Sequence, residues 1–259
     1  MTLGLPVSTL LAFLLVLARV GGLITFLPVP GFRNAPDPVR VVLVLAITFS
    51  LFPVWPSLPD ALPSFGNLIL WVFCETGFGL MTGLAIAFLT EGFQVASQML
   101  GIQAGYGFVT TIDPTSQADA GIIQVMMSLV TGLLFFTLRI DHLLIRLLAD
   151  SFERFPAGSW ALSAASMDGI VRLGSGMFST GIRLALPIAA MLLLIDLALA
   201  LLGRMQQQMH LLSLAFPVKM LTVLAILTVL APVIARVFEG AAERTMNTLW
   251  TLSAQAHPH

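Results

Sequence analysis

Six ionisable residues lie within or beside strongly apolar runs of this sequence, where a charge is costly and therefore informative: Arg19, Glu75, Glu91, Arg183, Asp196 and Lys219. A charge at the centre of a bilayer costs at least about 2.5–3.5 kcal/mol, so such side chains usually face protein or water and pair there. Two hypotheses fit the pattern. The residues form buried ion pairs between helices or subunits, or they line a conduction path or a proton relay. Burial inside an oligomer is the simplest single explanation for so many.

A polar stripe begins at the third of these residues. Glu91, Gln94 and Gln98 are spaced i, i+3 and i+7, so they share one face of a helix. The stripe leads directly into Gly101. It predicts either a lumen-facing surface of a pore or a structural seam of hydrogen bonds inside a bundle, and the spacing alone does not separate the two.

The segment that follows the stripe is a poor transmembrane helix. Gly101, Gly105 and Gly107 each cost roughly 1 kcal/mol relative to Ala in a helix interior, and residues 109–112 are β-branched. Asp113 resembles an N-cap, with Pro114 at the first helical position. We therefore expect one helix to stop near Gly101 and another to start near Asp113. Non-helical backbone at membrane depth survives only where protein buries it or where it lines a cavity, which makes this segment a candidate pore element.

The elements that position these residues are apolar helices. Hydrophobic residues make up 58% of the 259-residue chain and charged residues 10%, with a mean hydropathy of +0.97. A spanning helix needs about 20 mainly apolar residues. The sequence predicts an all-α, polytopic membrane protein with about six apolar helical segments: residues 5–27, 39–55, 68–90 (continued by 92–100), 120–138, 173–202 and 211–235.

Proline and the remaining polar stretches divide these helices. Pro187, Pro217 and Pro232 fall inside predicted helices and each frees a main-chain carbonyl, so we expect kinks there. Residues 139–172 are predicted to form an amphipathic connector at the membrane interface. The tail after Ala235 has charges at helical spacing and is expected to form a short surface helix with a frayed end.

No pattern indicates an enzyme. The chain has four His residues, none at metal-ligand spacing with a second His or Glu, and neither a nucleophile elbow nor a P-loop. We therefore predict no cofactor, no metal site and no catalytic residue. The formal net charge is −1 without a basic patch, so nucleic acid is not an expected ligand. The single cysteine, Cys74, rules out an intramolecular disulfide and is expected to be a small buried apolar residue.

The Gly-rich segment also resembles a known family. Gly101-x-Gln103-x-Gly105, Phe108 and Asp113-Pro114-x-Ser116 are similar to the central signature of the FliR family, the R subunits of the flagellar and type III secretion export gate. A second set of similar residues follows in the order of the family: residues 185–187, 196–199, 204–205, 208 and 216–217. The resemblance covers residues 19–232, and the first motif is closer to the flagellar than to the injectisome form. One departure is the sequence Arg204-Met-Gln-Gln-Gln208, where the family usually has proline before the last glutamine.

This resemblance implies an inner-membrane export gate at the flagellar basal body, with one copy of this chain among several P and Q subunits. Residues 1–172 would form a P-like helical portion and residues 173–259 a Q-like hairpin with a short polar tail. Residues 101–116 would plug the pore, through Gly101, Gln103, Gly105, Tyr106, Gly107, Phe108, Asp113, Pro114 and Ser116. Arg204 would anchor the hairpin connection. The implied partners are the P and Q subunits, other export-apparatus membrane proteins, rod and basal-body proteins, and unfolded export substrates.

Other functions stay open on the sequence alone. Residues 104–107 faintly resemble a potassium-channel filter, although the threonine pair lies after the glycines instead of before them. Broken helices and buried charges also suit a secondary transporter, which would predict inverted repeats that the sequence does not display. The equivalent gate subunit of a virulence injectisome is a further alternative.

Overall fold

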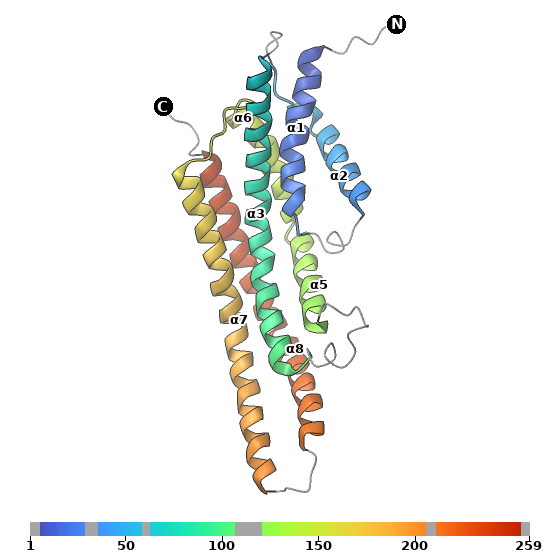
Figure 1. The fold of residues 1–259 in the computed structure, drawn as a ribbon, viewed down its shortest axis with the longest axis vertical. Helices are drawn as coiled ribbons and strands as arrows, with labels where there is room; N and C mark the ends of the chain where they lie inside the picture. The colour runs from blue at the N-terminus through green and yellow to red at the C-terminus, as the bar shows by residue number, and fades with distance from the viewer. Residues whose placement is uncertain (1–5, 29–35, 59–62, 107–120, 206–210, 255–259) are drawn as a thin grey trace. The chain divides into compact units, whose positions relative to one another are not determined.

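The computed structural model describes residues 6–28, 36–58, 63–106, 121–205 and 211–254. These residues form helices with the following bounds: α1 Val7–Phe26, α2 Asp37–Ser50, η2 Phe52–Val54, α3 Phe65–Ala104, α5 Ile122–Thr137, α6 Ile140–Arg154, α7 Ala164–Met205 and α8 Leu211–Ala254 (Figure 1). The described part of the chain contains no strand. This agrees with the predicted all-α class.

Two of the long helices, α3 and α7, begin at a capping serine. Ser64 precedes α3 and its Oγ accepts a hydrogen bond from the main-chain N–H of Asn67 at 3.3 Å. Ser163 does the same for Ser166 at the start of α7, at 3.1 Å. A side-chain oxygen at the N-cap satisfies one of the main-chain donors that a helix leaves free at its start.

Four helices are long and apolar enough to cross a membrane, namely α1, α3, α7 and α8, or five spans if α5 and α6 count as one broken span. The prediction of a polytopic helical membrane protein is thereby confirmed. The predicted span over residues 39–55 is wrong, because α2 has 14 residues and covers only about 21 Å. Its helix ends at Ser50, and Pro53 then lies within the separate turn η2.

The segment predicted over 120–138 matches α5, Ile122–Thr137, which has 16 residues and is followed by a bend of 57° into α6. The bounds of two other predicted segments differ from the structure. The last two helices are longer than predicted, with 42 and 44 residues, because α7 begins at Ala164 and α8 runs through the polar tail to Ala254. The tail is therefore not a separate surface helix. Pro187, Pro217 and Pro232 all lie inside continuous helices.

The chain divides into two compact units. Unit 1 comprises residues 1–88, 135–174 and 242–259, and unit 2 comprises residues 89–134 and 175–241. In unit 1, α1 lies alongside the N-terminal half of α3 (Figure 1), and glycines allow the close approach. A Cβ on Gly22 would lie 2.6 Å from the carbonyl oxygen of Thr76, and one on Gly83 would lie 2.5 Å from that of Leu23. The core of this unit is aromatic and aliphatic, with Phe78, Phe152, Phe155 and Trp160 buried together.

Unit 2 is built on the C-terminal part of α3, most of α5, and residues 175–205 of α7 and 211–241 of α8. Gly92 and Gly181 let α3 and α7 touch, since a Cβ on Gly181 would lie 2.8 Å from the carbonyl oxygen of Gly92. The rings of Phe93 and Phe238 pack in a tilted arrangement, with centroids 5.3 Å apart, and both side chains are fully buried. These contacts hold the C-terminal part of α3 against α7 and α8.

Candidate functional site

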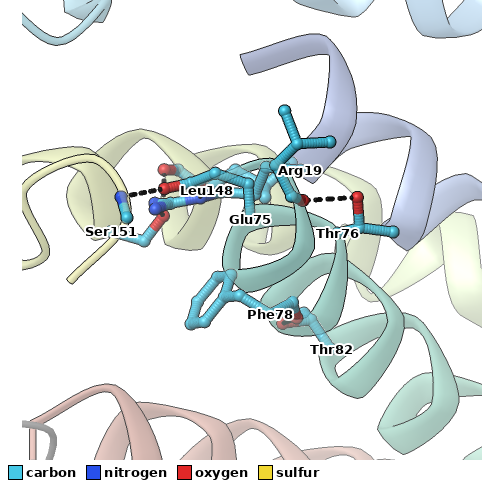
Figure 2. Close-up of polar contacts among 9 residues, drawn as sticks. Arg19, Glu75, Thr76, Phe78, Thr82, Leu148 and Ser151 are labelled. Atoms are coloured by element: carbon cyan, nitrogen blue, oxygen red, sulfur yellow. Dashed lines mark hydrogen bonds and ion pairs between the residues drawn. The ribbon is translucent and has the colours of Figure 1, made fainter. Parts of the chain in front are cut away.

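A buried ion pair organises unit 1. The Arg19 Nε of α1 donates to the Glu75 Oε2 of α3 at 2.5 Å, and neither side chain has exposed surface. Arg19 Nη1 also donates to the Ser151 hydroxyl of α6 at 2.7 Å (Figure 2). The guanidinium lies over the ring of Phe152, 4.1 Å from its centroid. One arginine therefore joins three helices.

The loop after α6 docks on the same carboxylate. The Gly158 N–H donates to Glu75 Oε1 at 2.9 Å, so both carboxylate oxygens of Glu75 are used. Gly158 has φ 75°, a conformation that glycine adopts at little cost, and an added Cβ would meet the ring of Trp71. Trp160 packs edge-on against Phe78, with ring centroids 5.9 Å apart. This loop is thus held by main-chain and aromatic contacts.

The end of α3 is set by a glycine. The helix continues through Gly101 to Ala104, so the prediction that it stops near Gly101 is wrong by about one turn. Gly105 has φ 88°, its N–H donates to the Ile102 carbonyl at 3.1 Å, and the Tyr106 N–H donates to the Gly101 carbonyl at 3.0 Å. This is the Schellman arrangement, in which a left-handed glycine closes a helix and satisfies its last carbonyls. A Cβ on Gly101 would meet nothing within 4 Å, so no close packing requires glycine there. The helix-propensity penalty of a single glycine, about 1 kcal/mol relative to alanine, is too small to end the helix.

Two side chains tie this helix end to the rest of unit 2. The Gln103 side-chain amide donates to the Ala189 carbonyl of α7 at 3.1 Å. The Tyr106 hydroxyl donates to the Met220 carbonyl of α8 at 3.3 Å. Burial raises the pKa of the Tyr106 phenol. The remaining residues predicted for the plug, Gly107, Phe108, Asp113, Pro114 and Ser116, lie outside the described residues.

The side chains of the polar stripe on α3 become more exposed toward the C-terminal end of the helix. Glu91 and Gln94 are half-buried and Gln98 is exposed. Glu91 has interactions within the described chain. The stripe therefore emerges from the interior of unit 2 toward the C-terminal end of α3.

A second ion pair joins the last two helices. Lys219 Nζ of α8 lies 2.8 Å from Asp196 Oδ1 and 3.0 Å from Oδ2 of α7. The lysine side chain is 13% exposed and the aspartate 44% exposed. Arg183 and Arg204, also on α7, are exposed. Of the six ionisable residues, the structure thus brings together two oppositely charged pairs, Arg19–Glu75 and Asp196–Lys219.

Sequence reasoning missed Ser151 and Gly158 as partners of the buried pair, and Trp160 as a neighbour of Phe78 in the same core. Their only sequence signal is the turn sequence Phe155-Pro-Ala-Gly158, which predicts a loop and does not reveal where the loop docks. Among the described residues, no group of three His, Cys, Asp or Glu side chains comes close enough to hold a metal ion.

Long apolar helices that bury paired charges define the class of this molecule: a polytopic helical membrane protein. The chain belongs to the bacterial export proteins, family 1, whose family model matches residues 10–245, and to the FliR group within it. It is 31% identical to the flagellar biosynthetic protein FliR of Escherichia coli over 234 residues, which is 90% of this chain and 89% of that protein.

Proteins of the same name from distant bacteria align over similar lengths. FliR of Bacillus subtilis is 26% identical, covering 94% of this chain and 95% of its own length, and FliR of Aquifex aeolicus is 24% identical, covering 87% of each. These matches confirm the family that the Gly-rich motif indicated. Membership in a family of non-enzymatic export proteins agrees with the prediction that the chain is not an enzyme.

Proposed function

We propose that this chain is the R subunit of the flagellar protein export gate. In this proposal, one copy assembles with several P and Q subunits in the bacterial inner membrane, at the flagellar basal body. Together they form the pore through which unfolded flagellar proteins leave the cell. The observation that carries the proposal is the family match over residues 10–245, together with similarity to FliR proteins along nearly the whole chain.

The exposed surface of α7 and α8 supports a multisubunit assembly. Only 17% of the most apolar stretch of α7 and 22% of that of α8 is buried within the chain, against 44% for α1 and 50% for α3. Large apolar surfaces of this kind are covered by partner proteins or by lipid. We assign residues 173–259 to a Q-like hairpin that packs against Q subunits, and residues 1–172 to a P-like portion.

We further propose that residues 101–116 plug the closed pore. The described part of this segment supports the idea, because its start is closed by Gly105 and fastened to α7 and α8 through Gln103 and Tyr106. Anchors at one end would hold the segment across the lumen while leaving the rest free to be displaced by a substrate. The polar stripe Glu91, Gln94 and Gln98 would then approach the lumen from the side of α3.

Native mass spectrometry of the detergent-solubilised chain, co-expressed with its neighbouring genes, tests the assembly. We expect a complex that contains one copy of this chain and several copies of two small membrane proteins. A chain that stays alone, or that forms only homo-oligomers, would contradict the gate proposal and favour a transporter or a channel.

Swimming assays test the flagellar setting. The gene is expressed in an Escherichia coli strain that lacks its own FliR, with empty vector and the native gene as controls. Restored or partial swimming supports flagellar export. If the chain instead restores secretion only in an injectisome that lacks its R-type subunit, the virulence system is the correct setting.

A further inference from the structure

Two polar contacts of unit 2 meet on neighbouring residues of α8. The Tyr106 hydroxyl, at the end of α3, donates to the Met220 carbonyl at 3.3 Å. Lys219, the residue directly before Met220, pairs with Asp196 of α7 at 2.8 Å. From this arrangement we propose that the Asp196–Lys219 ion pair is a latch. It holds α8 against α7 where the Met220 carbonyl meets Tyr106, and breaking the pair releases the end of α3.

The latch lies at the edge of the buried part of the two helices. Leu192 of α7 and Val223 of α8 are fully buried. Asp196 follows Leu192 by four residues and Lys219 precedes Val223 by four, so the pair lies about one helical turn beyond both. Farther in that direction, none of the side chains that the structure describes in α7 or α8 is buried. Apolar burial within this chain therefore ends before the pair, and the ion pair extends the contact between the helices.

A proline makes this part of α8 depend on a contact from outside the helix. Pro217 lies inside α8, two residues before Lys219. Proline has no N–H and cannot donate to the carbonyl four residues earlier, which weakens a helix at that point. The turn that carries Lys219 and Met220 therefore begins at a weakened point, and a bond to α7 restrains it.

The ion pair can open without unfolding the core. The Lys219 ammonium contacts both carboxylate oxygens of Asp196, at 2.8 and 3.0 Å, and the lysine side chain is largely buried. A largely buried ammonium needs a compensating charge, so the contact is favoured while the helices are together. The Asp196 side chain is 44% exposed, however, and the buried Leu192 and Val223 lie one turn away. Opening of the pair is therefore a local event.

The other anchor of α3 provides an internal comparison. The Gln103 amide donates to the Ala189 carbonyl at 3.1 Å, and Ala189 precedes Asp196 by seven residues, about 10 Å along α7. Substitutions at such a separation usually have additive effects, whereas substitutions that share a contact do not. The latch therefore predicts that the ion pair is coupled to Tyr106 and independent of Gln103.

The latch bears on the last turn of α3. The Gly105 N–H donates to the Ile102 carbonyl and the Tyr106 N–H to the Gly101 carbonyl, so the amides of residues 105 and 106 report whether this turn is closed. The latch itself is a property of unit 2. Its consequence for the pore, that it sets how firmly the start of the plug is held, rests on the function proposed above.

Hydrogen–deuterium exchange of the full chain in detergent, with any subunits that co-purify, tests the latch. Asp196→Asn and Tyr106→Phe should each speed exchange of the amides of residues 105 and 106 about five-fold. Combined, they should exchange about as fast as the faster single variant, because both act through one contact. Asp196→Asn combined with Gln103→Leu should instead show the product of the two single effects.

Two further variants make the result specific. Exchanging the charges, with Asp196→Lys and Lys219→Asp together, restores the attraction and should return exchange close to the wild-type rate. Arg236→Gln removes an exposed arginine farther along α8 and should change nothing. If Asp196→Asn does not fold, Tyr106→Phe decides the question. Because coupling is reciprocal, it should speed exchange in residues 219–224, and Gln103→Leu should not.

The outcomes for the latch and for the plug are distinguishable. Unchanged exchange of residues 105 and 106 in Asp196→Asn, or a product of effects in its combination with Tyr106→Phe, would overturn the latch. If Asp196→Asn speeds exchange but its assembled complex does not leak ions in planar bilayers, the latch stands and the plug does not. If Tyr106→Phe complexes leak while Asp196→Asn leaves exchange unchanged, the plug stands and the latch is wrong.

Discussion

Arg19 of α1 and Glu75 of α3 form an ion pair in which neither side chain reaches solvent. Breaking a buried pair by removing one partner leaves an uncompensated charge, which typically costs about 3–5 kcal/mol. We therefore expect Glu75→Gln to destabilise unit 1 strongly, although it preserves shape and the acceptor for the Gly158 N–H. Thermal unfolding in detergent, followed by loss of helical circular dichroism, measures the effect.

A double variant separates charge from packing. Arg19→Met together with Glu75→Gln removes both charges, and it should recover much of the stability lost by Glu75→Gln alone. The control is Asp168→Asn, because Asp168 and Arg172 form an exposed pair with side chains 59% and 79% accessible, and it should change the melting temperature little. A double variant no more stable than Glu75→Gln would contradict the ion-pair interpretation.

Gly158 is the second residue of this cluster at which a substitution should lower stability. Its φ of 75° disfavours any other residue, and a Cβ would run into the Trp71 ring. Gly158→Ala should therefore lower stability by roughly 1–3 kcal/mol and loosen the loop that docks on Glu75. Limited proteolysis within residues 155–163, compared between wild type and variant, reports the loosening directly. Unchanged cleavage together with an unchanged melting temperature would show that the loop is not held this way.

The contact between α1 and α3 predicts opposite effects of the same substitution at two glycines. A Cβ on Gly79 would meet the backbone of Arg19 and Leu23, whereas one on Gly66 would meet nothing within 4 Å. We expect Gly79→Ala to destabilise by pushing the helices apart, and Gly66→Ala to be neutral or stabilising by up to about 1 kcal/mol. Comparing the two melting temperatures checks this, and equal shifts would contradict it.

Periodicity and composition predict most of this fold, since an apolar run long enough to span a bilayer has few alternatives to a helix. Gly79 and Gly83, four residues apart on α3, both lie where α1 comes close, since a Cβ on either would meet the backbone of α1. What failed were the ends of helices. Glycine content suggested a stop near Gly101, but propensity is a weak prior, and the helix ends three residues later because of the left-handed glycine at position 105.

The buried pair shows a different limit of sequence reasoning. Arg19 and Glu75 were recognisable as costly charges, but their pairing with each other depends on the register of α1 against α3, which only packing sets. Ser151 and Gly158 join the cluster from segments 76 and 83 residues beyond Glu75, and no local pattern connects them. Long-range partners of a charge therefore need the tertiary structure.

A substitution at Tyr106 tests the plug proposal with little change to the structure. Tyr106→Phe removes one hydroxyl and its hydrogen bond to the Met220 carbonyl, worth about 1 kcal/mol, and leaves the ring in place. If the segment closes the pore, this change and Gln103→Leu should each raise ion leakage through the assembled complex, measured as conductance in planar bilayers. Ile102→Val, at an exposed neighbour, is the matched control. Closed, non-leaking complexes from both anchor variants would argue against a plug fastened at these residues.

Removing the charge of Asp196 and removing that of Lys219 should reduce the yield of assembled complex to different extents, because the two side chains differ in exposure. The lysine is 13% exposed and the aspartate 44% exposed, so Asp196→Asn strands a largely buried ammonium, whereas Lys219→Met leaves a carboxylate that is closer to the surface. We therefore expect Asp196→Asn to reduce the yield of assembled complex more than Lys219→Met does, with the double variant between wild type and Asp196→Asn. Yield by size-exclusion chromatography ranks the three variants. If Asp196→Asn assembles as well as wild type, the pair is not a structural contact of the α7–α8 hairpin, and the charge of Asp196 must serve another purpose.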